Sequence, residues 1–238
     1  MNQFDAFIDD LRSTHGKNLA AVILYGSAAA GDFIPRQSDY NVLIALHRIG
    51  PEDLRNSHAT IREWHRLGQP VPVYFTVSEL QNAADVFPIE FHQMEDARRV
   101  LYGTDVLAGV KISDKFLRHQ VEYELRSKLI LLRRQYIPAS ASVEGLKSLM
   151  AESLASFATL FRAVLLLYSI DSPPTKHETV ALAADHLKLN GAVFERIFNI
   201  RERNDDGTMD EAEANRLFGD YMDQIERVID AVDAAERS

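Results

Sequence analysis

Cysteine is absent from this sequence of 238 residues, so disulfide bonds and thiolate metal sites are excluded. Basic residues are also few relative to acids. The 26 lysines and arginines stand against 35 aspartates and glutamates, which gives a formal net charge of −9. We therefore expect no extended basic surface for nucleic acid. The hydrophobic fraction of 46% is ordinary for a globular protein and excludes a mainly disordered chain.

Long apolar runs are missing as well. The first five residues (MNQFD) show no basic region leading into an apolar stretch, as a secretory signal would. The longest apolar helix candidate, at about 154–170, contains Arg162 and several small polar residues, and we expect it to be too short and too polar to span a bilayer. The sequence thus predicts a soluble, cytoplasmic protein with no membrane partner.

The spacing of apolar residues changes once along the chain. Up to about residue 110, short β-branched and apolar runs predict strands over 19–25, 40–46 and 71–77, and a fourth over 87–91. From Ser113 onward only helical spacing occurs, with apolar stripes three or four residues apart. The sequence therefore predicts an α+β domain with a mixed sheet over 1–110, followed by an all-α helical bundle over 111–238.

One stretch of the predicted α+β domain carries chemical meaning. The buried run 20–25 ends at Gly26-Ser27, and after eleven further residues comes Asp39-Tyr40-Asn41. A glycine after a buried strand lets the backbone approach a ligand closely. A serine at the start of a following helix offers N–H and hydroxyl groups to a phosphate. Residues 39 and 41 share one face of a strand, where an acid could hold a divalent cation against that phosphate. The alternative is a surface turn with a solvated Asp39.

This arrangement resembles the nucleotidyltransferase superfamily, in which Gly-Gly or Gly-Ser is followed, after a gap of about ten residues, by Asp-x-Asp or Asp-x-Glu. The stretch from Tyr25-Gly26-Ser27 to Ser38-Asp39 is similar to antibiotic adenylyltransferases and minimal nucleotidyltransferases. The sharp resemblance covers 20–46, and a vaguer one takes in 99–103 and 174–178. It implies a nucleotidyltransferase-type sheet with flanking helices, Mg²⁺, and transfer of a nucleoside monophosphate from a nucleoside triphosphate to a hydroxyl.

The sequence departs from that pattern in its acids. Active members hold two metal ions with three carboxylates, and here only the first, Asp39, is present. Asn41 stands at the second position, where its amide oxygen can coordinate Mg²⁺ without adding charge. The third acid is expected within 71–77, where Tyr74 stands by position and where the sequence contains no aspartate or glutamate. Glu90, on the predicted fourth strand, is a candidate substitute, although a salt-bridged surface acid is the alternative reading.

These considerations give two function hypotheses. The first is a nucleotidyltransferase of low activity, and the alternative is a catalytically silent relative, a pseudoenzyme, that senses nucleotide or binds protein. The acceptor is left open between a small antibiotic, a protein and an RNA end, and the sequence also leaves a homo-oligomer open. The predicted site residues are Asp39, Asn41 and Glu90 for catalysis, Asp39 and Asn41 for the metal, and Gly26, Ser27 and Lys176 for the nucleotide.

Overall fold

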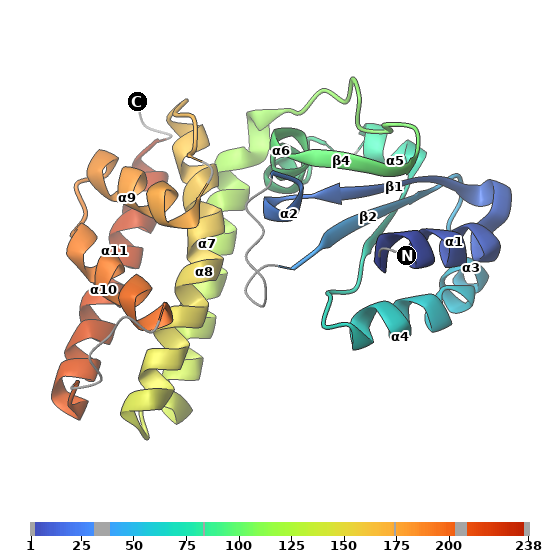
Figure 1. Ribbon diagram of the computed structural model, residues 1–238. Helices are drawn as coiled ribbons and strands as arrows, with labels where there is room; N and C mark the ends of the chain where they lie inside the picture. Colours follow the sequence, from blue (N-terminus) through green and yellow to red (C-terminus); the bar gives the residue numbers. More distant parts are fainter. Residues whose placement is uncertain (1–2, 31–38, 83, 174, 203–208, 236–238) are drawn as a thin grey trace. The chain divides into compact units, whose positions relative to one another are not determined.

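Residues 3–30, 39–82, 84–173, 175–202 and 209–235 are described by the computed structural model in Figure 1. The chain divides into two compact units, unit 1 over Met1–Lys115 and unit 2 over Phe116–Ser238, against a predicted boundary at about residue 110. Unit 1 is an α+β structure and the described part of unit 2 is entirely helical and irregular, so the predicted fold class is confirmed.

Unit 1 is built on a mixed sheet of four strands in the order β3-β2-β1-β4 (Figure 1). β1 pairs antiparallel with both β2 and β4, whereas β2 and β3 are parallel. The strands are β1 (Leu19–Tyr25), β2 (Asn41–Leu46), β3 (Val73–Thr76) and β4 (Arg98–Gly103). The three strands predicted within 19–77 are therefore confirmed as neighbours in one sheet.

Helices cover both faces of this sheet, which explains why its central strands are apolar on both sides. The first face packs against α1 and α4 through Phe7 and Trp64, whose rings stack with centroids 4.3 Å apart. The second packs against α5 and α6 through Leu80 and Phe91. The helices and 3₁₀ turn of unit 1 are α1 (Gln3–His15), η1 (Gly16–Asn18), α2 (Ser27–Ala30), α3 (Pro51–Asn56), α4 (His58–Arg66), α5 (Val77–Asn82) and α6 (Pro88–Asp96).

The fourth strand is not where the sequence predicted it. Residues 87–91 enter helix α6, because Pro88 takes the first helical position, where a proline loses no intrahelical hydrogen bond. The fourth strand is β4, which begins at Arg98 and ends at Gly103. A Cβ at Gly103, where φ is +78°, would lie 2.0 Å from the carbonyl oxygen of Ala20. The close approach of β4 to β1 therefore requires glycine at this position.

Unit 2 is a helical bundle in which α8 packs against all four of the other helices. Side-chain oxygens of Ser142, Thr175 and Asp210 cap the N-termini of α8, α9 and α11, where backbone N–H groups lack helical partners. The elements are η2 (Asp114–Phe116), which crosses the boundary, α7 (Leu117–Ala139), α8 (Val143–Leu167), α9 (Lys176–His186), α10 (Gly191–Arg201) and α11 (Glu211–Ala234).

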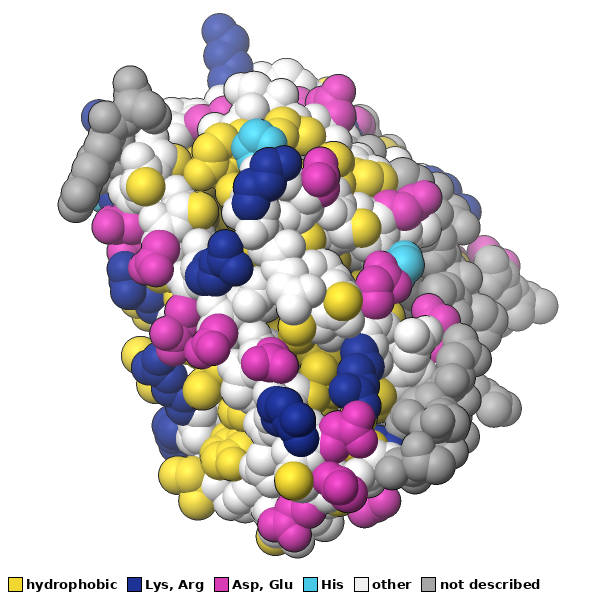
Figure 2. All heavy atoms as spheres, turned by 90° about the vertical axis from the view of Figure 1, so that its left-hand side faces the viewer, with side chains coloured by type: hydrophobic (Ala, Val, Ile, Leu, Met, Phe, Trp, Pro, Cys, Tyr) yellow, Lys and Arg dark blue, Asp and Glu magenta, His cyan; other side chains and the backbone are white. Residues whose placement is uncertain are grey.

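Helix α8 is longer and more apolar than the sequence pattern predicted. By length and composition it could cross a membrane, the one such helix among the described residues. In the bundle, 61% of its most apolar window is buried, as is usual for the central helix of a helical unit. Over the face of unit 2 turned to the viewer in Figure 2, acidic and basic side chains are interspersed. The apolar character of α8 thus serves packing within unit 2.

Candidate functional site

The turn after β1 is formed by Gly26, whose φ of +75° places it in the left-handed region. Its N–H donates to the carbonyl oxygen of Ala97 (3.0 Å), and its own carbonyl oxygen accepts from the N–H of Ala29 (2.9 Å). Helix α2 is a short helix of four residues that begins at Ser27, and the N–H of Ala29 within it is the donor to the Gly26 carbonyl. A left-handed glycine turn thus lies where the sequence predicted the phosphate site.

Gly26 also lies against Asn41, the first residue of β2. A Cβ added to Gly26 would be 3.3 Å from the amide nitrogen Nδ2 of Asn41. Asn41 pairs across the ladder with Tyr25, and Tyr25 pairs on its other side with Arg98 of β4. Directly paired residues project to the same face of a sheet, so these three side chains form a row. Tyr25 packs with the core that contains Leu43, which shows that the row lies on the α6 face.

Asp39 lies two residues before Asn41, ahead of the ladder, and is exposed. No hydrogen bond or ion pair joins its carboxylate to any other described residue. The following residue, Tyr40, is fixed by a hydrogen bond from its N–H to Oε1 of Gln69 (2.9 Å). Residues 31–38 and the side chain of Ser27 lie outside the described structure. Asp39 therefore offers a solvent-facing carboxylate next to Asn41 in the sequence.

Tyr74 does not stand beside Asn41. It pairs with Ile44 of β2 and packs with the core on the α1 and α4 face, whereas Asn41 lies on the α6 face. The interpretation of Tyr74 as the replacement for a third acid is therefore wrong. The residues of β3 on the α6 face are Val73 and Phe75, and neither is acidic. The expectation that β3 supplies no carboxylate holds.

The hydroxyl of Tyr74 is instead buried in a polar corner of unit 1. Burial raises the pKa of Tyr74, and a nearby Ser57 hydroxyl works in the opposite sense. Within the described part of the chain its oxygen has no partner at normal hydrogen-bond geometry. Ser57 is itself engaged, since its Oγ lies 2.9 Å from Nε2 of His15 and donates to the carbonyl oxygen of Asp53 (3.0 Å). Tyr74 thus belongs to a structural cluster, away from Gly26.

Glu90 lies on a helix and not on the predicted fourth strand. It lies in the first turn of α6, one residue before Phe91, which is buried against β1 and β2. Burial raises the pKa of the Tyr25 phenol, and the negative charge of Glu90 raises it further. Glu90 therefore belongs to the helix that covers the face of the sheet carrying Asn41.

Arg98 completes the row, and its role was not evident from the sequence because β4 was not predicted. Its Nε donates to both carboxylate oxygens of Asp105, at 3.2 and 3.0 Å, and its Nη1 contacts the carbonyl oxygen of Met94 at 3.5 Å. The pair is partly buried, with side-chain exposures of 22% and 32%. The guanidinium is thereby held near Met94, in the last turn of α6.

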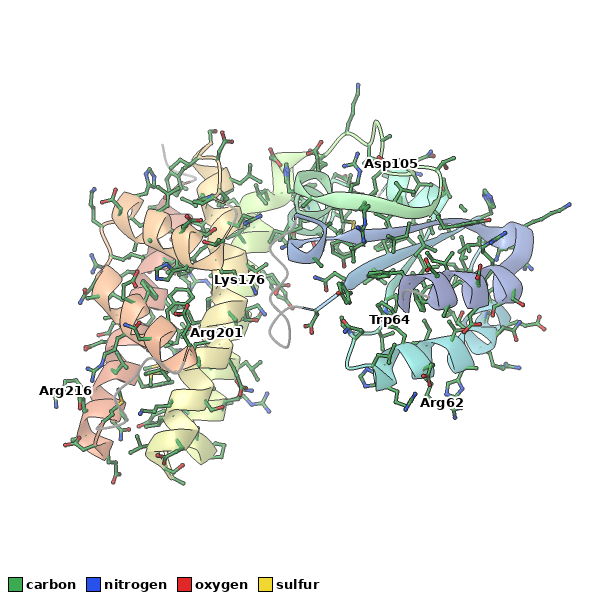
Figure 3. The ribbon with its side chains drawn as sticks, viewed as in Figure 1. Arg62, Trp64, Asp105, Lys176, Arg201 and Arg216 are labelled. Carbon is green, nitrogen blue, oxygen red and sulfur yellow. The ribbon has the colours of Figure 1, made fainter. Side chains whose placement is uncertain are left out.

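Lys176, the remaining predicted contact, belongs to unit 2 (Figure 3). It is the first residue of α9, follows the N-cap Thr175, and is exposed. No group of three or more His, Asp or Glu side chains within the described ranges could hold a metal ion. In unit 1 the structure brings together Gly26, Asn41 and Tyr25, with Asp39 adjacent in the sequence, and Glu90 lies on the helix that packs on the same face of the sheet.

Comparisons with known proteins bear on the fold. No protein-family model matches the chain, and no curated protein matches its sequence. A solved structure does match: spectinomycin adenyltransferase AAD(9) from Enterococcus faecialis, determined with ATP and spectinomycin. The two are 13% identical, the alignment covers 95% of this chain and 98% of the other, and the TM-score is 0.60. The chain therefore has the nucleotidyltransferase-type fold followed along the sequence by a helical unit, as its resemblance to that superfamily predicted.

Proposed function

We propose that this chain binds a nucleoside triphosphate at the Gly26 turn and transfers the nucleoside monophosphate slowly to a hydroxyl of a small-molecule acceptor. The observation that carries the proposal is the contact of the Gly26 turn with Asn41, two residues from the exposed carboxylate of Asp39. The similarity of the fold to that of an adenyltransferase whose structure was determined with ATP and spectinomycin also supports this proposal.

The phosphates are assigned to the Gly26 turn because of its shape and its donors. The left-handed glycine carries no side chain that would fill the space beside Asn41. The proposal assigns the phosphates to backbone N–H groups where the short helix α2 begins, since the N-terminus of a helix favours an anion.

The metal is assigned to Asp39 and Asn41, with the phosphate oxygens of the nucleotide completing the coordination of Mg²⁺. Mg²⁺ binds through carboxylates and substrate phosphates and gives up its water reluctantly. Asp39 and Glu90 together provide two negative charges, against the four positive charges of two divalent ions. Cation affinity is therefore low, and the transfer is slow.

In the transfer step, the acceptor hydroxyl oxygen attacks the α-phosphorus of the nucleotide. The bond from that phosphorus to the bridging oxygen breaks, and pyrophosphate leaves. The acceptor proton passes to a carboxylate. Glu90 is the candidate base, because an amide such as that of Asn41 cannot accept a proton at neutral pH.

Titration calorimetry with each nucleoside triphosphate, with and without Mg²⁺, tests the binding site. We expect Gly26→Val to abolish binding, because its side chain would occupy the space beside Asn41. Gly68→Val is a matched control: φ at Gly68 is +83°, and nothing lies within 4 Å of an added Cβ. Loss of binding in both variants, or in neither, would remove the Gly26 turn as the phosphate site. Absence of binding by the unmodified chain would remove nucleotide binding altogether.

The second candidate function is nucleotide sensing or protein binding without catalysis. The specific observation in its favour is that no third acid reaches Asn41 from β3, since Val73 and Phe75 occupy the α6 face there. Nucleotide binding without any label transfer to acceptors, under conditions that saturate the metal, would favour this second function over the first.

A further inference from the structure

The Gly26 turn is fastened to the segment that leads into strand β4. The ladder between β1 and β4 ends at the pair Tyr25 and Arg98. One position further out, the N–H of Gly26 donates to the carbonyl oxygen of Ala97 (3.0 Å). This bond lies beyond the last rung of the ladder, and hydrogen bonds at the end of an element open more readily than those inside it. The geometry of the turn consequently depends on what keeps Ala97 in place.

The start of strand β4 is attached through the side chain of Arg98, the residue after Ala97. Among the described strands β4 is at the edge of the sheet and pairs with β1 alone. The Nε of Arg98 donates to both carboxylate oxygens of Asp105, at 3.2 and 3.0 Å. Its Nη1 lies 3.5 Å from the carbonyl oxygen of Met94, in the last turn of α6. The guanidinium thus joins the loop after β4 and the end of α6 to the residue next to Ala97.

Asp105 is itself fixed within the loop after β4 (Figure 3). Its Oδ1 also accepts from the N–H of Leu107 (3.1 Å), and Leu107 is 6% exposed and packs with the core on the α6 face. The acid is therefore tied to that core while it holds Arg98. Hydrogen bonds between charged groups are stronger than those between neutral ones. The side chains of Arg98 and Asp105 are 22% and 32% exposed, so solvent screens the pair only in part.

We propose that Asp105 is a positioning residue for the nucleotide. Through Arg98 it fixes the start of β4 and, with it, the carbonyl oxygen of Ala97. That oxygen holds Gly26 in the left-handed turn beside Asn41. A turn that is already fixed loses less conformational freedom when a ligand binds, so the affinity is higher. The inference rests on the proposed function, because the turn that Asp105 fixes is the one assigned to the phosphates.

The hold on the turn can be measured without nucleotide. The variant Asp105→Asn keeps an oxygen for the N–H of Leu107 but loses the charge that holds Arg98. In a chain labelled with ¹⁵N-glycine, NMR follows the exchange of the Gly26 amide hydrogen, whose signal is assigned from Gly26→Ala. We expect the variant to accelerate this exchange about 10-fold, the scale of a hydrogen bond to a charged group.

Gly68 provides a control in the same spectrum. Its φ is also positive, at +83°, and its N–H donates to the carbonyl oxygen of His65 (2.9 Å). Exchange at Gly68 should be the same in Asp105→Asn and in the wild type. Unchanged exchange at Gly26 would overturn the proposal, because the turn would not be held through Asp105. Equal acceleration at both glycines would also overturn it, because unit 1 as a whole would then have loosened.

The consequence for the nucleotide is measured by titration calorimetry with ATP and Mg²⁺. We expect Asp105→Asn to weaken ATP binding by about 10-fold, whereas Asp105→Glu, which keeps the charge, should retain most of the affinity. Arg98→Gln should weaken binding to the same extent, and the double variant should lose no more than either single variant, because the two act as one unit. Glu63→Gln is the matched control: it breaks the two hydrogen bonds from Arg66 within α4 and should bind as the wild type does.

The outcomes separate this inference from the proposed function. If the wild type binds ATP and Asp105→Asn binds it equally well, the inference is wrong while the proposed function stands. In that case a loss confined to Arg98→Gln would mean that Arg98 contacts the phosphates directly. The inference is equally wrong if the two losses add fully in the double variant. If the unmodified chain binds no ATP, the proposed function fails and the positioning role fails with it.

Discussion

Gly26 and Asn41 lie so close that a Cβ on the glycine would stand 3.3 Å from the asparagine amide nitrogen. The turn proposed for phosphate and the residue proposed for metal are therefore neighbours, although many residues separate them along the chain. Asn41 is also within the row that contains Tyr25. Changes at position 41 should consequently alter metal and nucleotide binding together.

Replacing Asn41 by aspartate adds a full negative charge at this point. We expect Asn41→Asp to raise Mg²⁺ affinity in the presence of nucleotide by about tenfold, since a carboxylate ligand interacts with the cation far more strongly than an amide. Titration calorimetry with Mg²⁺ and ATP measures the change. Asn82→Asp, an exposed substitution on α5, is the charge-matched control. Equal affinities of the Asn41→Asp variant and the wild type would contradict the metal assignment.

The third acid can be restored only on the correct face. Val73 pairs with Leu43 on the α6 face and is 37% exposed, so Val73→Glu, combined with Asn41→Asp, should raise metal affinity further. Tyr74→Glu should not, because position 74 faces the opposite side, where a buried unpaired charge costs about 3 kcal/mol or more of stability. Denaturant unfolding followed by Trp64 fluorescence, alongside the metal titration, distinguishes the two. Greater metal affinity from Tyr74→Glu would reverse this assignment of faces.

The central strands β1 and β2 could be predicted from the sequence because both of their faces are buried. In β2, five of six residues are buried, which produces a continuous apolar run. The edge strand β4 begins with two arginines and is largely exposed, so it lacks such a run. Pro88 suits both a strand start and the first turn of a helix, and local sequence alone did not decide between them.

The candidate site was predictable only where it is local in the chain. The Gly26 turn and Asn41 were identified from spacing, and the structure places them in contact. The side of the sheet on which Tyr74 lies could not be predicted from the sequence. A shift of one residue along a strand moves each side chain to the other face, and the register of β3 is set by its pairing with β2. The placement of Glu90 on a helix that covers the Asn41 face depends on how α6 packs, which no sequence motif predicts.

Protonation of His15 should destabilise unit 1 in mildly acidic solution. His15 is buried, and its Nε2 lies 2.9 Å from Oγ of Ser57. Burial lowers its pKa below the ordinary value of 6.5, and the charge of Asp53 opposes this in part. A lowered pKa means that the folded state binds the proton less readily than the unfolded state. The stability contribution is therefore complete above pH 6.5 and is lost as the pH falls toward the folded-state pKa.

The measurement is the free energy of unfolding of wild type and His15→Gln at about pH 7.5 and about pH 5.5. The glutamine amide can replace the hydrogen bond to Ser57 but does not titrate. We expect the variant to lose less stability between these two conditions than the wild type. His58→Gln, at an exposed position of α4, should follow the wild type. Identical pH dependence in His15→Gln would show that His15 is not the group responsible.

A methyl group at Gly103 should disrupt the pairing of β4 with β1. Both Gly103 and Gly109 have positive φ, at +78° and +79°, so an alanine costs about 1–2 kcal/mol of backbone strain at either position. Only at Gly103 would the Cβ also meet backbone, 2.0 Å from the Ala20 carbonyl oxygen, whereas Gly109 has open space. Denaturant unfolding should show a clearly larger loss for Gly103→Ala, and equal losses would contradict the steric argument.

The most direct test of the central claim is transfer of label from α-³²P nucleoside triphosphates to a panel of small hydroxyl acceptors, with Mn²⁺ or Mg²⁺. The proposed function predicts slow, metal-dependent transfer, reduced about 10²–10⁴-fold or more by Asp39→Ala and increased by Asn41→Asp. Asp85→Ala, which removes an exposed acid of the same unit, should leave the rate unchanged. Transfer that persists undiminished in Asp39→Ala, or complete absence of transfer from a chain saturated with nucleotide and metal, would contradict it.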